Sequence, residues 1–590
     1  MSSDVYCEHR VTLPWCYYDK KQKKIMFRLL CPSDVKTAVL LWGDPYDWQE
    51  TGKGYKEWRF SESELRRSFT GADRVAWNVE IELPQFRRLK YGFRLENETG
   101  VFYFSENGVE PYAADTINRT HNHFLYPFIH DVDAPNTPEW AEQTVWYQIF
   151  PDRFYRKENS GPASVQLEDW RNNRPNYRSF YGGNLAGIRE KLPWLSDLGI
   201  SGLYLTPIFR SPSNHKYNTE DYFAVDPLFG DLNELKALVS EAHGLNIRVM
   251  LDAVFNHAGE THPFWQDVLH NQDRSQYKDY FHIRRFPIRP PQALPFYKDM
   301  DFHAFAWFQR MPKWNTENPG TRKYLLDAAV YWIKECDIDG WRLDVANEVS
   351  FDFWKEFSRL THSLKTDFYI VGEIWNDASA WINPGLFDAA MNYPLGSAVS
   401  DCFITKKISP EAFTRKLFSA LTRYSELHNR VSFNLLDSHD TDRVLTRARG
   451  DKLALKNAFT MLFLFPGSPS IYYGTEIGME GGGDPDCRRP MIWDENLQDR
   501  ELFSFFQNLI KFRKQYLPVI NGSKLHYQVE NEVHQWCLYG GAGQLVAVYS
   551  EKATKFDAPG NCVFGPEPDL AQYQNGELPP YTLAVYNKKA

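Results

Sequence analysis

The sequence predicts an α/β protein: a closed (β/α)8 barrel with an inserted subdomain after the third strand, an N-terminal β-sandwich and a C-terminal β-domain. Three observations support this. The chain has 590 residues, more than one hydrophobic core usually serves, so two or three domains are expected. Sequence patterns typical of β-strands occur at both ends of the chain. Between the ends, strand and helix patterns alternate, which is typical of a parallel sheet with crossover helices.

Residues 1–125 are predicted to form the β-sandwich. They contain strand-like segments such as VKTAVLLWGDPYDW, WNVEIELP and RLKYGFRLEN, separated by Gly, Pro and charged turns. The following stretch HDVDAPNTPEW (130–140) carries Pro and Asn residues, so it is predicted to link this domain to the next.

Residues 138–517 are predicted to form the barrel. Helical segments such as DLNELKALVSEAHGL and TRKYLLDAAVYWIKEC repeat apolar residues three and four apart, and they lie between or after eight strand-like segments. Eight such units are the number in a (β/α)8 TIM barrel. The predicted strands are VWYQIF (145–150), GLYLTPI (202–208), RVMLDAVFNH (248–257), GWRLDVA (340–346), FYIVGEI (368–374), FDAAMNYP (387–394), VSFNLLDSHD (431–440) and SPSIYYGTEIG (468–478).

One barrel unit is oversized. Between His257 and Asn318 no strong helical periodicity is visible, and the Pro-, Phe- and Arg-rich stretch HIRRFPIRPPQALPFYKD lies there. We interpret residues 258–316, approximately, as a subdomain inserted over the barrel mouth, where it would form one wall of a cleft. Residues 518–590 return to short strands such as QLVAVYS, so they are predicted to form a small C-terminal β-domain.

Composition excludes several classes of function. The formal charge is −9 without a block of Lys or Arg, so no nucleic-acid partner is expected. The start MSSDVYCEHRVTLPW lacks a cationic stretch followed by an apolar one, and no apolar run approaches membrane-spanning length. We therefore expect a cytoplasmic protein without a membrane partner. The eight cysteines form no C-x-x-C pair, so buried, reduced thiols are expected rather than a zinc or redox site.

Four acidic residues fall late in predicted strands, where a barrel places its catalytic side chains. They are Asp252, Asp344, Glu373 and Asp440, on the third, fourth, fifth and seventh strands. For any one of them, a helix cap or an ion pair is the more ordinary explanation. Four together favour catalysis, and we expect the carboxylates to meet at one rim.

The surroundings of two of these carboxylates suggest different roles. Arg342 lies two positions before Asp344, so both side chains face the same side of the strand. The guanidinium is expected to keep Asp344 ionised, as a nucleophile requires. Glu373 lies in the apolar setting VGEIW, where desolvation would raise its pKa and preserve the proton of a general acid. Such a pair is what retaining glycoside hydrolysis requires.

Asp440 fits a third essential carboxylate near the sugar ring, beside His439. His257 fits a donor to sugar hydroxyls. Each histidine is also explained by an ordinary structural role at a strand end, and the sequence leaves both explanations open.

At these residues the sequence resembles the α-amylase superfamily. The motifs are DAVFNH (252–257), DGWRLDVANEV (339–349), GEIW (372–375) and LLDSHD (435–440). The tail VANE, MPKWN (311–315), TVWYQIFPDRF (144–154) and the N-terminal WGDPYDW resemble the neopullulanase, cyclomaltodextrinase and maltogenic amylase group. The resemblance spans essentially the whole chain. It implies a glycosidase for α-1,4 and some α-1,6 bonds of cyclodextrins, pullulan and maltooligosaccharides.

The resemblance also implies individual roles. Asp344 matches the family nucleophile, Glu373 the acid/base, and Asp440 the carboxylate that binds ring hydroxyls and distorts the sugar. The positions that match substrate-binding residues are Tyr217, His257, Arg342, Asn347, Glu348, Trp375, His439, Asp484 and Arg488. Among them, Tyr217 matches a ring that stacks beneath the sugar. Asn347, Glu348 and Trp375 match the leaving-group side, and Asp484 and Arg488 match the non-reducing side.

The chain departs from the family pattern at several positions. Asn218 follows Tyr217 where Asp is frequent, and Trp314 stands in MPKWN where Leu is common. Some relatives bind calcium through Asn and Asp residues after the DRF segment. This chain has YRKENSGP there and Asn184 where Asp is usual, and oxygen ligands with few full charges bind calcium weakly. No metal or cofactor is therefore expected.

Other functions stay open from the sequence. The same three carboxylates would serve an α-1,6-glucosidase or an α-glucan transferase. A rival of another class is a catalytically inactive glucan-binding or transporter-partner protein, which the complete carboxylate set with Arg342 argues against. The resemblance further implies a homodimer paired through the N-terminal domain. That domain is rich in aromatic residues, which would suit such an interface, a sugar-binding face or the core of the domain itself. They include Trp42, Tyr46, Trp48 and Trp58.

Overall fold

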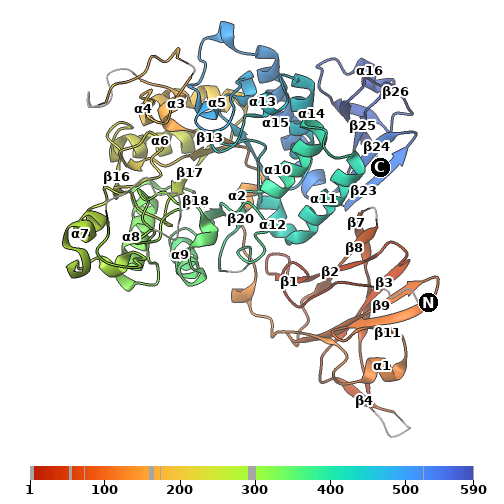
Figure 1. Ribbon diagram of the computed structural model, residues 1–590. Helices are drawn as coiled ribbons and strands as arrows, with labels where there is room; N and C mark the ends of the chain where they lie inside the picture. The colour runs from red at the N-terminus through yellow and green to blue at the C-terminus, as the bar shows by residue number, and fades with distance from the viewer. Residues whose placement is uncertain are drawn as a thin grey trace. The chain divides into compact units, whose positions relative to one another are not determined.

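A computed structural model describes residues 6–51, 56–71, 73–157, 165–172, 174–289, 300–383, 385–522, 524–541 and 543–588. The chain divides into two compact units, and Figure 1 shows its elements. The first unit comprises Met1–Asn136, Lys406–Asn429 and Tyr516–Ala590, and the second comprises Thr137–Thr405 and Arg430–Gln515.

The second unit is built on eight parallel strands. They are β13 (Trp146–Ile149), β14 (Gly202–Leu205), β17 (Arg248–Ala253), β18 (Gly340–Leu343), β19 (Tyr369–Gly372), β20 (Ala389–Ala390), β21 (Phe433–Asn434) and β22 (Ser468–Tyr472). Seven neighbouring pairs are hydrogen-bonded in the order β20-β19-β18-β17-β14-β13-β22-β21. A parallel bridge between Met391 and Phe433 joins the two ends of this sheet. The sheet is therefore closed, and the predicted (β/α)8 barrel is confirmed.

Helices follow most strands, as the periodicity predicted (Figure 1). They include α4 (Leu185–Glu190), α5 (Leu192–Leu198), α6 (Leu232–Gly244), α8 (Pro319–Cys336), α9 (Phe351–Leu364), α10 (Tyr393–Val399), α14 (Lys452–Phe463) and α15 (Arg500–Asn521). Side-chain caps define their starts. Asp231 accepts from Glu234 N at the start of α6, and Asn318 accepts from Gly320 N and Thr321 N at the start of α8. Strand β18 then follows α8 after a short turn.

The segment after β17 differs from the prediction in one respect. It contains the nine-residue helix α7 (Pro263–Asn271), where the sequence showed no strong helical periodicity. His262 caps α7 by accepting from Phe264 N, and Pro263 fits the first helical turn. Nine residues are too few for a clear apolar repeat, which explains the miss. Residues 290–299 of the predicted insertion lie outside the described residues.

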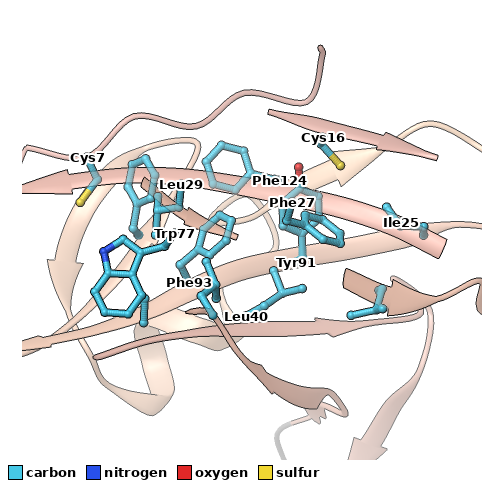
Figure 2. Packing of buried hydrophobic residues seen from close by; sticks show 14 of the residues in the cluster. Cys7, Cys16, Ile25, Phe27, Leu29, Leu40, Trp77, Tyr91, Phe93 and Phe124 are labelled. Atoms are coloured by element: carbon cyan, nitrogen blue, oxygen red, sulfur yellow. The ribbon is translucent and has the colours of Figure 1, made fainter. Parts of the chain in front are cut away.

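The N-terminal part of the first unit is a two-layer β-sandwich, as predicted. One layer contains β1 (Cys16–Asp19), β2 (Lys24–Pro32), β8 (Arg74–Glu82) and β7 (Arg66–Thr70). The other contains β11 (Gly108–Pro111), β10 (Gly100–Ser105), β9 (Leu89–Asn97), β3 (Thr37–Gly43) and β6 (Ser61–Glu64), with β12 (Phe124–Tyr126) paired to β9. Between them, Phe27 and Leu29 of β2 pack in one cluster with Leu40, Tyr91 and Phe93 (Figure 2). Burying these apolar side chains stabilises the two layers.

The predicted C-terminal β-region is also present in the first unit. Its main strands are β23 (Lys524–Glu530), β24 (Val533–Gly540), β25 (Gly543–Ser550), β29 (Thr582–Lys588) and β27 (Asn561–Phe564). They continue the sheet of β1, β2, β8 and β7, because β23 pairs in parallel with β7 through Leu525 with Phe69 and His526 with Thr70. The sequence had suggested two separate β-regions, whereas nine strands form one sheet.

The cysteine prediction is confirmed in its structural part, since all eight cysteines are free and buried. Within the described ranges, we find no helix that is both long and apolar enough to cross a membrane.

Candidate active site

Arg342 gathers three carboxylates at the C-terminal ends of adjacent barrel strands. Its Nη1 lies 2.9 and 3.0 Å from the two oxygens of Asp252 and 2.8 Å from Asp344 Oδ1. Its Nη2 lies 2.9 Å from Glu373 Oε2. Asp252 belongs to β17, Arg342 to β18, and Glu373 follows β19 directly. Parallel neighbours therefore bring residues far apart in sequence to one guanidinium.

Burial dominates the electrostatics of this cluster. It raises the pKa of Asp252 to about 6, against the opposing pull of Arg342. Burial, together with Glu373 and Asp252, raises the pKa of Asp344 well above its usual value, and Arg342 only partly offsets this. Arg342 thus contacts Asp344 as predicted, but the pKa of Asp344 is shifted in the direction opposite to the one expected from Arg342 alone. The single guanidinium of Arg342 does not offset the burial of Asp252 and Asp344, so the pKa of each is raised.

Glu373 is oriented by two donors. The backbone N–H of Val345 donates to Glu373 Oε2 at 2.9 Å, and Trp375 Nε1 donates to Oε1 at 3.1 Å. The Trp375 ring stacks on Tyr393 with centroids 4.0 Å apart and an interplanar angle of 7°. Val345 has a φ of 45°, a costly conformation for a β-branched residue. It follows Asp344 directly, so this strained turn aims a backbone donor at the neighbouring carboxylate.

Tyr217 and His439 form the next layer of the site. The Tyr217 hydroxyl donates to Asp252 Oδ2 at 3.0 Å and lies 2.7 Å from His439 Nε2. The amide of Gln148 donates to His439 Nδ1 at 2.7 Å, so the ring proton resides on Nε2, which lies 2.7 Å from the Tyr217 hydroxyl and 3.1 Å from Asp440 Oδ2. Burial lowers the pKa of His439 well below its usual range. His439 is therefore a neutral donor within this network.

Arg488 holds the remaining carboxylates. Its Nε donates to the carbonyl of His439 at 2.8 Å, and its Nη2 donates to Asp440 Oδ1 at 3.0 Å. Its Nη1 pairs with Asp484 at 3.0 Å. The Asp440 side chain is 31% exposed, whereas those of Asp344 and Glu373 are each 8% exposed. Asp440 lies several residues beyond β21, so its position depends on Arg488 and His439 rather than on the strand.

His257 lies on the other side of Tyr217. Its Nε2 donates to the carbonyl of Tyr217 at 3.1 Å, and its ring stacks on Phe305 with centroids 5.1 Å apart. Burial lowers the pKa of His257 to about 3, so this ring is neutral. Asn347 and Glu348 are exposed and belong to the short turn Ala346–Glu348 that follows Asp344 and Val345. All twelve predicted site residues thus lie on strand ends, or on the loops and turns that follow the barrel strands.

Several residues in this network escaped the sequence analysis. Tyr204 donates to Asp252 Oδ2 at 2.6 Å, and Gln148 donates to His439. Both are polar residues inside otherwise apolar strands, β14 and β13, and that contrast was a usable signal. Lys313, which contacts Glu348, lay inside a quoted motif but was given no role. Tyr393 carried no local signal, because its stacking on Trp375 depends on tertiary packing.

The positions considered for calcium are Asn184 and the loop that follows Phe154. Asn184 Oδ1 accepts from Gly187 N at 2.7 Å and so caps α4. Residues 158–164 of the loop in question fall outside the described ranges. No group of three or more His, Cys, Asp or Glu side chains suited to a metal occurs among the residues that the structure describes. The absence of a calcium site stays a prediction.

Comparisons with known proteins match this architecture. Residues 148–522 match the family described as alpha amylase, catalytic domain, and residues 4–130 match the alpha amylase N-terminal ig-like domain. The chain is 45% identical to a cyclomaltodextrinase of Geobacillus thermopakistaniensis (strain MAS1), covering 89% of this chain and 87% of that protein. It is 44% identical to an intracellular maltogenic amylase of Bacillus subtilis, covering 87% and 84%. A solved cyclomaltodextrinase structure superposes with a TM-score of 0.86 at 36% identity, covering 99% of both chains.

Proposed function

Because this chain belongs to the α-amylase family, it is a glycoside hydrolase, and we propose that it cleaves α-1,4 and some α-1,6 glucosidic bonds with retention of configuration. The substrates proposed are cyclodextrins, pullulan and maltooligosaccharides. One observation carries the proposal: Asp344 and Glu373 lie within 2.9 Å of the two terminal nitrogens of one guanidinium. Carboxyl pairs of retaining enzymes lie about 5–5.5 Å apart, and two carboxylates held by one guanidinium fit that spacing.

The proposed reaction uses these carboxylates in two steps. Glu373 donates its proton to the glycosidic oxygen while Asp344 attacks the anomeric carbon, so the leaving sugar departs and a glycosyl ester forms. Glu373 then accepts a proton from water, whose oxygen attacks the same carbon and releases Asp344. Asp440, held by Arg488, is the carboxylate proposed to bind ring hydroxyls, and Tyr217 is proposed to stack beneath the sugar.

Incubation with β-cyclodextrin, pullulan and starch side by side tests this proposal. We expect ring opening of the cyclodextrin, and the initial reducing end formed by cleavage should have the α configuration. A β-anomeric product would exclude retention. Release of maltotriose from pullulan without cyclodextrin turnover would indicate an α-1,6-glucosidase, because only α-1,6 hydrolysis frees that unit. A change in chain lengths without new reducing ends would indicate a transferase. Absence of any product would favour the glucan-binding alternative.

We also propose a homodimer that pairs through the N-terminal sandwich, and a cytoplasmic location. Tyr46 is 76% exposed and lies beneath the Arg88 guanidinium, so it is available to a partner, whereas Trp58 is buried in its own domain. The similarity to a protein named intracellular supports the location, as do the eight buried thiols.

The mass of the intact protein in solution tests the dimer. We expect twice the chain mass for the wild type and a shift towards the monomer for Tyr46→Ala. A monomeric wild type would overturn the proposal. Point variants are preferable to deletion of residues 1–125, because deletion would leave β23 without its neighbour β7 and expose a sheet edge. Fractionation of the producing cells tests the location.

A further inference from the structure

Lys313 lies where the inserted subdomain returns to the barrel. Its backbone forms an antiparallel bridge with His257, and the N–H of Trp314 donates to the carbonyl of Asn256 at 3.1 Å. These contacts place Lys313 beside the residues that follow the third barrel strand. Hydrogen bonds to a distant part of the chain therefore fix the backbone position of Lys313.

The Lys313 ammonium group has three oxygen acceptors. It donates to Asn256 Oδ1, to the carbonyl oxygen of Glu348 at 3.0 Å, and to Glu348 Oε2 at 3.1 Å. An ammonium group carries three donor protons, so these acceptors match its capacity. The Lys313 side chain is 18% exposed. The charge is thus directed at the protein rather than at water.

These contacts join two parts of the site. On one side, the Asn256 amide nitrogen lies 3.2 Å from His257 Nδ1, so the bond from Lys313 to the amide oxygen orients that amide towards the histidine. On the other side, Glu348 ends the turn Ala346–Glu348, which begins after Val345, the donor to Glu373. Lys313 binds both the carbonyl and the carboxylate of Glu348, which restrains backbone and side chain together.

We propose that Lys313 is a positioning residue that determines how the glycosyl intermediate partitions between water and a sugar acceptor. The inference rests on the proposed function, in which Asn347 and Glu348 line the leaving-group side. An acceptor sugar must occupy that same side. Its hydroxyl transfers a proton to Glu373, its oxygen bonds to the anomeric carbon, and the bond from that carbon to Asp344 breaks.

The expected effect follows from the loss of restraint. Without the ammonium, the turn of Glu348 gains conformational freedom and the Glu348 carboxylate loses its counter-charge. Ordering this turn around a bound sugar then costs more free energy. Water needs no such binding surface. Removal of Lys313 should therefore favour hydrolysis over transfer.

The test compares wild type, Lys313→Met and Lys313→Arg on maltotriose with added methyl α-glucoside as acceptor. The measured quantity is the ratio of transfer product to hydrolysis product. We expect Lys313→Met to lower this ratio at least threefold and Lys313→Arg to lie between the two. The ratio does not depend on the amount of folded enzyme, so lost stability alone does not change it. Lys313→Gln serves as the neutral variant if the methionine variant does not fold.

Lys236→Met is the matched control. Lys236 of α6 pairs with Glu335 of α8 at 2.7 Å, so this variant also removes a lysine from an ion pair in the same unit. We expect its ratio to equal that of the wild type. The inference is overturned if the neutral Lys313 variant keeps the wild-type ratio, if Lys236→Met lowers the ratio equally, or if the wild type forms no transfer product at saturating acceptor. A wild type without glucan hydrolysis would instead refute the proposed function.

Discussion

The rim of the barrel and the core of the N-terminal sandwich bury side chains of opposite character. At the rim, the buried guanidinium of Arg342 contacts three carboxylates at 3.0 Å or less. In the sandwich core, Figure 2 shows mainly aromatic and aliphatic side chains. A buried polar group there, His9, bonds to the carbonyl of Arg28 and the hydroxyl of Tyr91, and burial lowers its pKa to about 4. Charged groups are concentrated at the rim, whereas the cluster in Figure 2 is built of apolar and aromatic side chains.

Strand direction explains much of the difference. All barrel strands are parallel, so their C-terminal ends meet at one rim and collect residues from distant parts of the chain. The sandwich strands in Figure 2 pair antiparallel, so successive strand ends alternate between opposite edges. The comparison teaches that the rim is organised for chemistry and the sandwich core for stability. Substitutions in the two regions should have separable effects.

The largest effect is expected from Asp344→Asn. It should lower kcat/KM on maltotriose by at least about 10⁴-fold, because the covalent route is lost. The shape of the side chain is retained, so the circular dichroism spectrum should not change. Asp327→Asn on α8 is the control. That carboxylate is exposed, and among the described residues its only ion pair is with Lys323. Turnover above a few per cent of wild type would contradict the assignment.

Glu373→Gln should distinguish substrates by their leaving groups. On maltotriose we expect a loss of about 10³-fold, because the departing sugar needs a proton. An activated aryl maltoside needs little protonation, so its initial burst of aryl alcohol should be nearly retained. Stopped-flow measurement of the burst checks this. Equal losses on both substrates would indicate a structural carboxylate.

Phe93→Ala tests the other region. Phe93 is completely buried in the sandwich core, and its truncation should lower the free energy of unfolding by about 3–4 kcal/mol. Chemical denaturation measures this change. Val101→Ala is the control: Val101 is exposed, so its truncation should change the free energy of unfolding by less than about 0.5 kcal/mol. The kcat/KM per folded molecule should stay at the wild-type value. A large loss of activity in the folded variant would break the proposed separation of the two regions.

The smallest effect concerns the pH dependence of stability at the rim. The pKa of Asp252 is about 6 in the folded protein and about 3.9 in an unfolded chain. Between these values the folded state binds more protons, so this group's contribution to stability decreases as pH rises from about 4 to about 6. Asp252→Asn does not titrate. Its stability relative to wild type should therefore rise by about 2–3 kcal/mol over that window. A constant or falling difference would contradict the raised pKa.

Some of the site was predictable because it depends on short-range geometry. Arg342 belongs to β18 and Asp344 directly follows that strand, and Arg342 Nη1 lies 2.8 Å from Asp344 Oδ1, as the spacing of two residues predicted. The net pKa direction of Asp344 was not predictable in this way. It depends first on burial and then on Glu373 and Asp252, which reach the same point from neighbouring parts of the barrel. A local pattern contains no information about how many carboxylates share one cation.

Other differences between the predicted and the observed structure also arise from contacts between distant parts of the chain. The seventh strand was predicted to run to Asp440, but β21 covers only Phe433–Asn434, and Arg488 binds the His439 carbonyl and the Asp440 carboxylate beyond the strand. The parallel pairing of β7 with β23 joins the two ends of the chain, and no local periodicity encodes which edges will meet.

The sequence alone therefore determined the order and type of the main elements, the eight-unit barrel, and the strand ends that carry the candidate carboxylates. Periodicity and spacing act over a few residues, and these properties depend on nothing longer. Tertiary structure decided which carboxylates share the Arg342 guanidinium, how their pKa values respond, which donors orient Glu373, and how the two β-regions join. These outcomes arise from contacts between distant segments in a low-dielectric interior, where each group's energy depends on all of its neighbours.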